Sequence, residues 1–421
     1  MLLQRVVLQN LRLALQRGLR EFDLKRAGQA IRIKTSTCLD TSLLASLWGL
    51  EVASGGDCGD VSVTEKAETL QEAKRKMKDS YCELELPFLA DKCLLEDYSA
   101  FYGGIRLGKL LEDLDILAAC IAYSHCGNGG MQRDLAIVTA SVDKIDLLMP
   151  TLAVGNYKCS GHVTFVGTSS MEVSIVVVNE SVSADSAVAI ARFTMVARNA
   201  QGKAAKVAPL VLETADENLL FETGKLNKDR KMAEKSPEFA KEFAPSMNEN
   251  ELLHQLFNGK ESAQAAHAEP VKGIEETKVC STKLCHLQER NIHNFIFGGF
   301  LMKEAYDLAY VAACKFLFFS KDDKKTTLET VSLDEISFKV PIPIGTILEF
   351  CSKVVYSQEC EFCVHTTAKA CCPWKREEIL TNEFIFTFRS NQPVPKVMPN
   401  NYSDALLFLQ QRRKREHSQE C

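Results

Sequence analysis

An internal repeat constrains the fold of this chain more than any other feature of its sequence. Two apolar stretches, each entered through a glycine, begin at Gly108 and Gly299, which lie 191 residues apart. The run 141–145 (SVDKI) recurs at the same spacing as 332–336 (SLDEI). A constant offset across stretches of different local character indicates that one structural unit has been duplicated along the chain.

Each copy combines one apolar helix with several strands. The helices are predicted over 108–124 and 299–317, and both are apolar on nearly every side, which is typical of a buried helix. Runs with strand-like patterns follow the first helix near 135–149, 158–166, 170–179 and 188–198. The strand-like run 171–176 corresponds to 361–366 in the second copy. A sheet wrapped around a central helix, present twice, predicts an α+β chain of two tandem hotdog domains, a double hotdog.

The repeat also predicts how the chain is divided. The segments are a mitochondrial transit peptide over 1–34, a leader over 35–74, a first hotdog domain over 75–200, a helical connector over 201–275, a second hotdog domain over 276–392 and a C-terminal tail over 393–421. The transit peptide is predicted because the first 20 residues hold four arginines and no acid, with apolar residues between them. An ordinary N-terminal helix is the alternative. The connector is predicted to be helical over 215–235 and 248–257.

Composition excludes several classes of protein. The net charge of −5 argues against a protein that binds duplex nucleic acid, because such a protein needs a clustered basic face. No apolar run reaches the roughly 18–20 residues of a membrane span. The 16 cysteines follow no framework and are interpreted as free thiols in a reducing compartment. Cys280, Cys285 and His286 lack the second half of a zinc motif, as does the pair 371–372, so no metal site is predicted.

The C-terminal run 412–415 (RRKR) is basic. It is either a targeting or phosphate-binding cluster or the solvated basic end of a C-terminal helix, which the helix dipole favours.

Short motifs carry a resemblance to a known family over about residues 75–410. They are 77–81 (MKDSY), 111–115 (LEDLD), 137–146 (IVTASVDKID), 160–163 (SGHV), 194–198 (TMVAR) and 288–291 (QERN) with the following glycines. With these motifs the sequence resembles the double-hotdog acyl-CoA thioesterases, and most of all the mitochondrial acyl-CoA thioesterase 9/10 group. The resemblance implies an enzyme of the mitochondrial matrix that hydrolyses fatty acyl-CoA. It also implies no cofactor apart from the CoA of the substrate, and a homo-oligomer, a trimer of double hotdogs.

The resemblance further implies a catalytic pair between the two hotdogs. In the family, an Asn before the glycines of one copy pairs with an Asp about two turns into the helix of the other. These positions are Asn291, eight residues before Gly299, and Asp115, seven residues after Gly108. Asp115 is expected to act as general base on a water or as the nucleophile, with Asn291 orienting the water or the carbonyl. The Gly299 N–H, at the positive end of its helix, is expected to hold the thioester oxygen.

The opposite pairing is missing from the sequence. Ala100 stands where the first copy would need Asn, and Tyr306 stands where the second would need Asp. Only one of the two pseudo-symmetric sites is therefore expected to be competent. The simpler alternatives are that Asp115 is a hydrogen-bonded buried acid and that Asn291 is a turn residue. The neighbouring acids Glu112 and Asp113 are expected to face solvent or to cap the helix, and Glu304 and Asp307 to have structural roles.

Contacts to CoA are predicted at two places. The turn 166–171 resembles a glycine-containing turn of the family in which a basic residue usually follows the glycine, and this sequence has Thr168 and Ser169 there. Gly298 and Arg290, near the entry of the second helix, are the other candidates.

Two other functions remain open from the sequence. A hotdog enoyl-CoA hydratase would need an Asp–His dyad, and neither His286 nor His293 has an acid at suitable spacing. A non-catalytic acyl-CoA-binding or regulatory double hotdog would need no catalytic pair. Convergence of Asp115 and Asn291 on one water distinguishes the enzyme from the binding protein.

Overall fold

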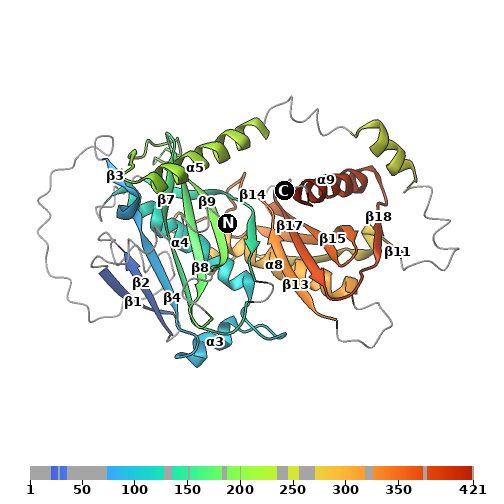
Figure 1. The fold of residues 1–421 in the computed structure, drawn as a ribbon, viewed down its shortest axis with the longest axis horizontal. Coiled ribbons are helices and arrows are strands. Elements are labelled where there is room, and N and C mark those ends of the chain that lie inside the picture. The colour runs from blue at the N-terminus through green and yellow to red at the C-terminus, as the bar shows by residue number, and fades with distance from the viewer. Residues whose placement is uncertain are drawn as a thin grey trace, which may run out of the picture. The chain divides into compact units, whose positions relative to one another are not determined.

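The computed structural model describes residues 20–26, 29–35, 74–127, 135–149, 152–182, 187–199, 201–234, 245–255, 271–317, 326–372 and 377–419. The chain forms two compact units (Figure 1). Unit 1 consists of Met1–Asn227, His286–Phe300 and Ser337–Ile344, and unit 2 of Lys228–Cys285, Leu301–Ile336 and Gly345–Cys421. The loop before the second buried helix thus belongs to unit 1, although it lies in the second copy of the repeat.

An antiparallel sheet forms the body of unit 1. Its strands run in the order β1-β2-β4-β7-β8-β9, and β9 also pairs with β5 and β6. The strands are β1 (Arg20–Arg26), β2 (Gln29–Thr35), β4 (Cys82–Leu86), β5 (Ala136–Val142), β6 (Ile145–Leu147), β7 (Tyr157–Val166), β8 (Ser170–Asn179) and β9 (Ala187–Arg198). Both β1 and β2 lie mostly within the predicted transit peptide, whose residues 1–19 lie outside the described part of the chain.

The helix α4 (Leu107–Cys126) packs against this sheet, as Figure 1 shows, and it contacts β4, β5, β7, β8 and β9. Leu110, Leu114, Leu117 and Ile121 follow each other at three- or four-residue spacing on one face and are all at most 1% exposed. Each such side chain contributes about 1.5–3 kcal/mol to folding when fully buried. The predicted hotdog arrangement of a helix held by a sheet is confirmed in this unit.

Shorter elements complete unit 1. These are β3 (Arg75–Lys76), η1 (Met77–Ser80), α3 (Lys92–Tyr98), β10 (Leu210–Val211), η3 (Leu287–Glu289) and the greater part of α5 (Ala215–Glu234). The helix α5 is the first predicted helix of the connector. Its Leu220 packs with Met77, Tyr81, Val176 and Val178 in one apolar cluster, so the connector is attached to the first repeat by burial of apolar surface.

Unit 2 has a second antiparallel sheet, of order β12-β15-β16-β17-β13. Its strands are β12 (Val279–Leu284), β13 (Leu328–Leu333), β15 (Ile347–Gln358), β16 (Glu361–Cys372) and β17 (Glu377–Ser390). Smaller elements are β11 (Val271–Gly273), η2 (Ile274–Thr277), β18 (Lys396–Met398) and a helix over 247–255, and β14 (Ile336–Ser337) spans the boundary between the two units.

Two helices cover opposite faces of this second sheet. On one face, Phe316 of α8 (Gly298–Leu317) contacts the ring of Phe362 with centroids 5.1 Å apart. On the other, Arg415 of α9 (Tyr402–Gln419) pairs with Glu361, the residue next to Phe362 on β16. Successive side chains of a strand point to opposite faces, so α8 and α9 lie on different sides of the sheet. The predicted buried helix 299–317 is confirmed as α8.

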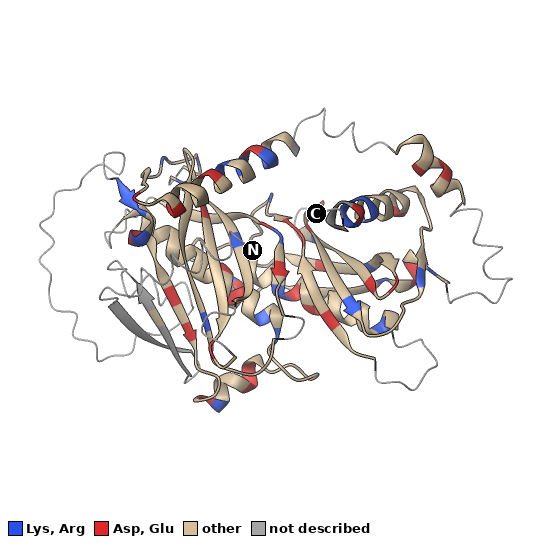
Figure 2. Cartoon of the chain, viewed as in Figure 1, with Lys and Arg blue, Asp and Glu red and all other residues tan. Residues whose placement is uncertain are grey.

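The basic C-terminal run is engaged in ion pairs within unit 2. Figure 2 shows α9 carrying these basic residues among acidic ones. The pairs are Arg412–Glu416 at 2.8 Å, Arg413–Glu249 at 2.6 Å, Lys414–Asp334 at 2.7 Å and Arg415–Glu361. Arg413 contacts both carboxylate oxygens of Glu249. Since all four cations are paired within the protein, the helix-end interpretation accounts for this run better than a phosphate-binding cluster.

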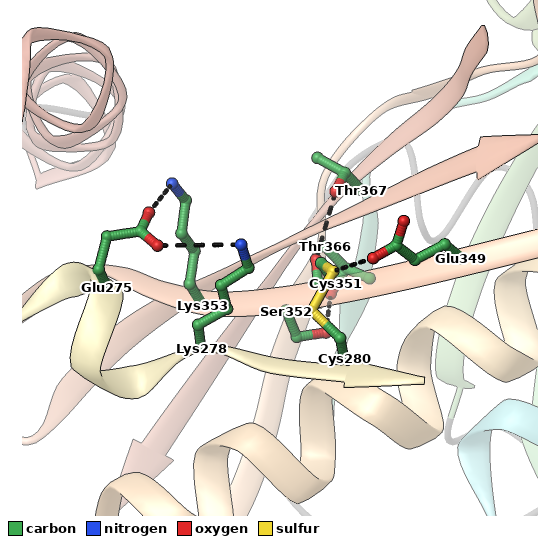
Figure 3. The surroundings of a disulfide bond; sticks show 9 residues. All are labelled: Glu275, Lys278, Cys280, Glu349, Cys351, Ser352, Lys353, Thr366 and Thr367. Atoms are coloured by element: carbon green, nitrogen blue, oxygen red, sulfur yellow. Dashed lines mark hydrogen bonds and ion pairs between the residues drawn. A yellow bond between two sulfur atoms is a disulfide. The ribbon is translucent and has the colours of Figure 1, made fainter. Parts of the chain in front are cut away.

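One expectation about the cysteines was wrong. Cys280 and Cys351 form a disulfide in unit 2, although the sequence was interpreted as containing only free thiols (Figure 3). The two residues are 71 positions apart and become neighbours because β12 pairs with β15 in the register that places Cys280 opposite Cys351. Spacing in the sequence does not specify the register of two distant strands, so the pairing could not be predicted.

Within the described residues, no helix is both long and apolar enough to cross a membrane.

Candidate active site

Asp115 lies in the middle of α4, inside unit 1, and its side chain accepts two hydrogen bonds. The Thr139 hydroxyl donates to Oδ1 at 2.8 Å, and the backbone N–H of Gly299 donates to Oδ2 at 2.7 Å. Asp115 is 5% exposed. Two of the predicted catalytic residues, Asp115 and Gly299, are therefore in direct contact, although 184 positions separate them in the chain.

This contact depends on the absence of a side chain at Gly299. A Cβ placed there would lie 2.9 Å from the Glu112 Cα and 3.0 Å from the Glu112 carbonyl oxygen, both backbone atoms of α4. Only glycine allows the start of α8 to approach α4 so closely. The first N–H groups of a helix have no partner within the helix and lie at its positive end. One of them is thus directed at the carboxylate.

Burial changes the acidity of this carboxyl group. It raises the pKa of Asp115 to about 6, and the hydrogen bonds from Thr139 and Gly299 oppose that rise because they stabilise the charged form. Near pH 7 the group is mostly a carboxylate, yet it is a stronger base than an ordinary aspartate. A carboxylate oxygen has two lone pairs, so each oxygen of Asp115 can accept a further hydrogen bond from a water. This combination suits a general base.

Thr139 is a site residue that the sequence analysis did not single out. It lies on β5, where the pairing with β9 shifts register between Thr139 and Ser141. A signal was present, because the second copy has Thr330 at the same 191-residue offset. In the structure the Thr330 hydroxyl lies 2.8 Å from the Tyr306 hydroxyl, and Tyr306 is the position equivalent to Asp115. The second copy thus keeps the hydroxyl and has replaced the acid by a phenol.

Asn291 lies in the turn that leads to α8. Its side-chain oxygen accepts hydrogen bonds from the backbone N–H groups of His293, at 2.9 Å, and Phe295, at 3.1 Å. The side-chain nitrogen Nδ2 has no hydrogen-bond partner within the described part of the chain, and the residue is only partly buried. Asn291 therefore supports its own turn and still has a donor group to offer.

The first copy shows that this turn does not require asparagine. Around Ala100, the Ala100 N–H donates to Gly104 at 2.9 Å and the Gly103 N–H donates to Ala100 at 3.0 Å. The same backbone bonds occur 191 residues later around Asn291. Since alanine supports the same turn, a structural role alone does not explain the asparagine at 291.

Of the residues predicted to contact CoA, one borders the Asp115 carboxylate, and the others are placed by their exposure and their backbone bonds. A Cβ on Gly298 would lie 3.2 Å from Oδ2 of Asp115, so this glycine borders the carboxylate. Arg290 is exposed. Thr168 is exposed and Ser169 half-buried, and their carbonyl oxygens accept bonds from the N–H groups of Val207 and Ala197. Among the described residues, neither Thr168 nor Ser169 forms a hydrogen bond with Asp115 or Asn291.

The expectation for the neighbouring acids on α4 was wrong. Glu112 and Asp113 are 4% and 1% exposed, although they were expected to face solvent or to cap the helix. Glu112 pairs with Lys109 at 3.0 Å, and Asp113 accepts a hydrogen bond from the Tyr98 hydroxyl. All but three of the 20 residues of α4 are buried, so acids that would be exposed on an ordinary helix are buried here with partners. Glu304, which was assigned a structural role, pairs with Lys283 at 2.9 Å.

The hydratase alternative finds no support in the histidine of this turn. His293 Nε2 lies 3.0 Å from the Tyr123 hydroxyl, which also accepts a bond from the Ile137 N–H. Its partner is thus a phenol rather than the carboxylate that an Asp–His dyad requires.

Comparisons with known proteins give relatives over most of the chain. It is 37% identical over 345 residues to acyl-coenzyme A thioesterase 9, mitochondrial, of Mus musculus, covering 80% of this chain and 77% of that protein. It is 36% identical over 345 residues to acyl-coenzyme A thioesterase 10, mitochondrial, of Mus musculus, with the same coverage of 80% and 77%. It is 33% identical over 333 residues to acyl-coenzyme A thioesterase 4, mitochondrial, of Humulus lupulus, covering 76% of this chain and 60% of that protein.

Solved structures are more distant. An acyl-ACP thioesterase from Bacteroides thetaiotaomicron aligns with 75% of this chain and 100% of that chain, at a TM-score of 0.43 and 12% identity. An acyl-CoA hydrolase from Staphylococcus aureus, in complex with butyryl coenzyme A and coenzyme A, aligns with 36% of this chain and 93% of that chain, at a TM-score of 0.32 and 23% identity. No protein-family model matches the chain.

Proposed function

The chain belongs to the family of the mitochondrial acyl-CoA thioesterases 9 and 10, and we propose that it hydrolyses fatty acyl-CoA at a site built around Asp115. It is an acyl-CoA hydrolase, a thioester hydrolase whose products are a carboxylic acid and free CoA. No cofactor is proposed, and CoA enters only as part of the substrate. The observation that carries the assignment of the site is the buried carboxylate held by Thr139 and Gly299.

In the proposed mechanism Asp115 acts as general base. Its carboxylate takes a proton from a water molecule, and the resulting hydroxide attacks the thioester carbonyl carbon. The tetrahedral intermediate then breaks its carbon–sulfur bond, and the CoA thiolate receives the proton from Asp115. Attack by the Asp115 carboxylate itself, through an anhydride that water then hydrolyses, is the second route that this geometry allows.

The supporting groups have distinct proposed roles. Thr139 and the Gly299 N–H fix the orientation of the carboxylate, since each donates to one of its oxygens. Asn291 offers its Nδ2 to the thioester oxygen or to the attacking water. In this structure the Gly299 N–H is occupied by Asp115, so it would reach a developing oxyanion only if it changed partner. CoA contacts are proposed for Gly298, Arg290, Thr168 and Ser169.

Release of free thiol from acyl-CoA esters of two to eighteen carbons tests the function and gives the preferred chain length. We expect the full chain to release CoA, and Asp115→Asn to lower kcat by about 10²–10⁴-fold. Thr330→Val, which changes the equivalent hydroxyl of the second copy, is the matched control and should keep kcat within about twofold. Saturable binding of acyl-CoA without any thiol release would favour the non-catalytic binding protein instead.

The cellular location of the protein is proposed from its relatives. The named relatives are mitochondrial proteins, which supports a mitochondrial location for this chain, and we propose the matrix as the compartment. We expect protease to leave the protein intact in whole mitochondria and to digest it once the inner membrane is opened.

We also propose that the chain assembles as a trimer of double hotdogs. Sedimentation of the full chain tests this.

A further inference from the structure

The disulfide on the outer face of the unit 2 sheet lies next to a carboxylate. Cys280 and Cys351 are directly opposed on the paired strands β12 and β15. Glu349 lies two residues before Cys351 on β15, so its side chain points to the same face of the sheet. Its Oε1 lies 3.5 Å from the Sγ of Cys351. Figure 3 draws the Glu349 side chain directed at this sulfur.

These three side chains are accessible from outside. Cys280 is exposed, and Cys351 and Glu349 are partly buried. The strand β12 pairs with β15 alone in the part of the chain that the structure describes, so the disulfide lies at a sheet edge. The alternate residues Leu348 and Phe350 are buried and point to the other face. A reductant can therefore reach the sulfur atoms without unfolding of the core.

The donor atoms of Cys280, Glu349 and Cys351 lie within 4.8 Å of one another. Two thiolates and a carboxylate are a donor set that Zn²⁺ binds well, with Zn–S distances of about 2.3 Å and a tetrahedral arrangement. In that geometry the two sulfur atoms stand about 3.8 Å apart. Facing cysteines on neighbouring strands can reach this separation by rotating their side chains, and water would occupy the fourth position.

We propose that Cys280, Cys351 and Glu349 form a redox-gated zinc site, closed by the disulfide and opened by its reduction. A dithiol reductant would transfer two electrons to the disulfide, breaking the S–S bond to give two cysteine thiols while its own two thiols join as a disulfide. Zn²⁺ then binds both sulfurs and displaces their two protons. A disulfide has no thiolate to offer, so the cross-link and the metal exclude each other.

Each state ties the edge strand β12 to the sheet, by a covalent bond in one case and by the metal in the other. Reduction without metal removes both ties and leaves the backbone ladder with β15 and the Lys283–Glu304 ion pair. Because β12 leads directly into the segment that carries Asn291, the state of this site sets how firmly the beginning of that segment is anchored along the chain. The proposal does not depend on the thioesterase activity.

The test compares zinc binding to the full chain before and after reduction. The protein is reduced with a phosphine, which does not compete for zinc as a dithiol would, and is then desalted without air. Zinc is titrated in competition with a coloured chelator. We expect reduced protein to bind one Zn²⁺ per chain that oxidised protein does not bind. Cobalt in place of zinc should give a thiolate-to-metal absorption band in the reduced form alone.

Variants assign the ligands. Cys280→Ser and Cys351→Ser should each abolish the gained site, and Glu349→Gln should weaken it by roughly tenfold or more. Cys93→Ser, which changes an exposed free cysteine, and Cys371→Ser, a partly buried one, should leave it unchanged. Amide exchange over residues 279–284 should be fastest in reduced protein without metal and slow again when zinc is added.

Two results would overturn the proposal. Equal zinc binding by reduced wild-type protein and Cys280→Ser, or the lack of a cobalt band in the reduced wild-type protein, would remove the metal site. Differential alkylation that finds Cys280 and Cys351 free before reduction would remove the gate.

Discussion

At the scale of single residues, the buried carboxylate of Asp115 suits catalysis but lowers the stability of the folded protein. Its folded-state pKa of about 6 lies above the ordinary value of 3.8 because it is buried. Between these two values the folded protein binds more protons than the unfolded chain, so stability decreases as pH rises through this range. Above pH 6 the contribution of Asp115 to the free energy of unfolding is therefore lower by about 3 kcal/mol than at low pH, where the group is protonated in both states. This cost is consistent with a group retained for its reactivity.

Asp115→Asn should therefore lose activity and gain stability. At pH 7 we expect the free energy of unfolding to rise by about 1–3 kcal/mol, because a neutral amide replaces a buried charge and its oxygen can still accept the Gly299 N–H. Near pH 4 most of this gain should disappear, since Asp115 is then protonated in the folded state. Urea denaturation of both proteins at the two pH values measures the difference. A variant that is less stable than wild type at both pH values would contradict this account.

Thr139 should tune the pH at which the site becomes active. As a general base Asp115 must be deprotonated, so kcat should rise with pH through a midpoint of about 6. The Thr139 hydroxyl lowers the pKa of Asp115, so Thr139→Val should move the midpoint upward and lower kcat at pH 6. The matched control is Thr330→Val, whose hydroxyl contacts Tyr306. A pH profile that is the same for both variants would place Thr139 outside the site.

At the scale of elements, the sequence predicted what hydrophobic patterning determines. The helices α4 and α8 lie within two residues of their predicted bounds because both are apolar almost all round. The distant segments that pack against these helices could not be predicted from the hydrophobic pattern. The approach of Gly299 to the backbone of Glu112 and the register that joins Cys280 to Cys351 depend on which distant segments pack together. Thr139 was overlooked because a hydroxyl on a strand is common, although its recurrence as Thr330 was visible in the sequence.

The approach of α8 to α4 gives an element-scale prediction. Gly299→Ala should cost about 1–3 kcal/mol of stability, because its Cβ meets backbone atoms of Glu112 that cannot move aside. It should also lower kcat by roughly tenfold or more, since the Gly299 N–H would be displaced from Asp115. Gly298→Ala is the control at the preceding position. A Cβ at Gly298 would lie 3.1 Å from the tip of the Phe338 ring and 3.2 Å from the Asp115 carboxylate, and both are side-chain ends.

Thermal unfolding and thiol release compare these two variants. The prediction requires Gly299→Ala to be the more damaging of the two in both measurements. If the two variants were equally stable and equally active, the start of α8 would tolerate a methyl group at position 299. The contact with Asp115 would then not be tightly held.

At the scale of the whole molecule, duplication preserved the architecture and let the chemistry diverge. Both copies keep the turn, the buried helix and a threonine hydroxyl beside the helix. They differ at the two positions that a catalytic pair would need. A buried acid whose pKa is raised, as that of Asp115 is, lowers stability at neutral pH. The Tyr306 hydroxyl and Thr330 form a neutral hydrogen bond instead, which carries no such cost. We therefore expect one functional site per chain.

The last prediction tests that asymmetry. Asp115→Asn and Asn291→Ala should each lower kcat by about 10²–10⁴-fold, and the double variant should be little worse than either, because the two residues act as a unit. Tyr306→Phe should cost about 1 kcal/mol of stability through the lost bond to Thr330 and leave thiol release within about twofold. Asp307→Asn should likewise have little effect on kcat, since Ala100 cannot complete a site in the second pairing. If Asp307→Asn abolishes thiol release while Asp115→Asn leaves it intact, the active site belongs to the other half of the repeat.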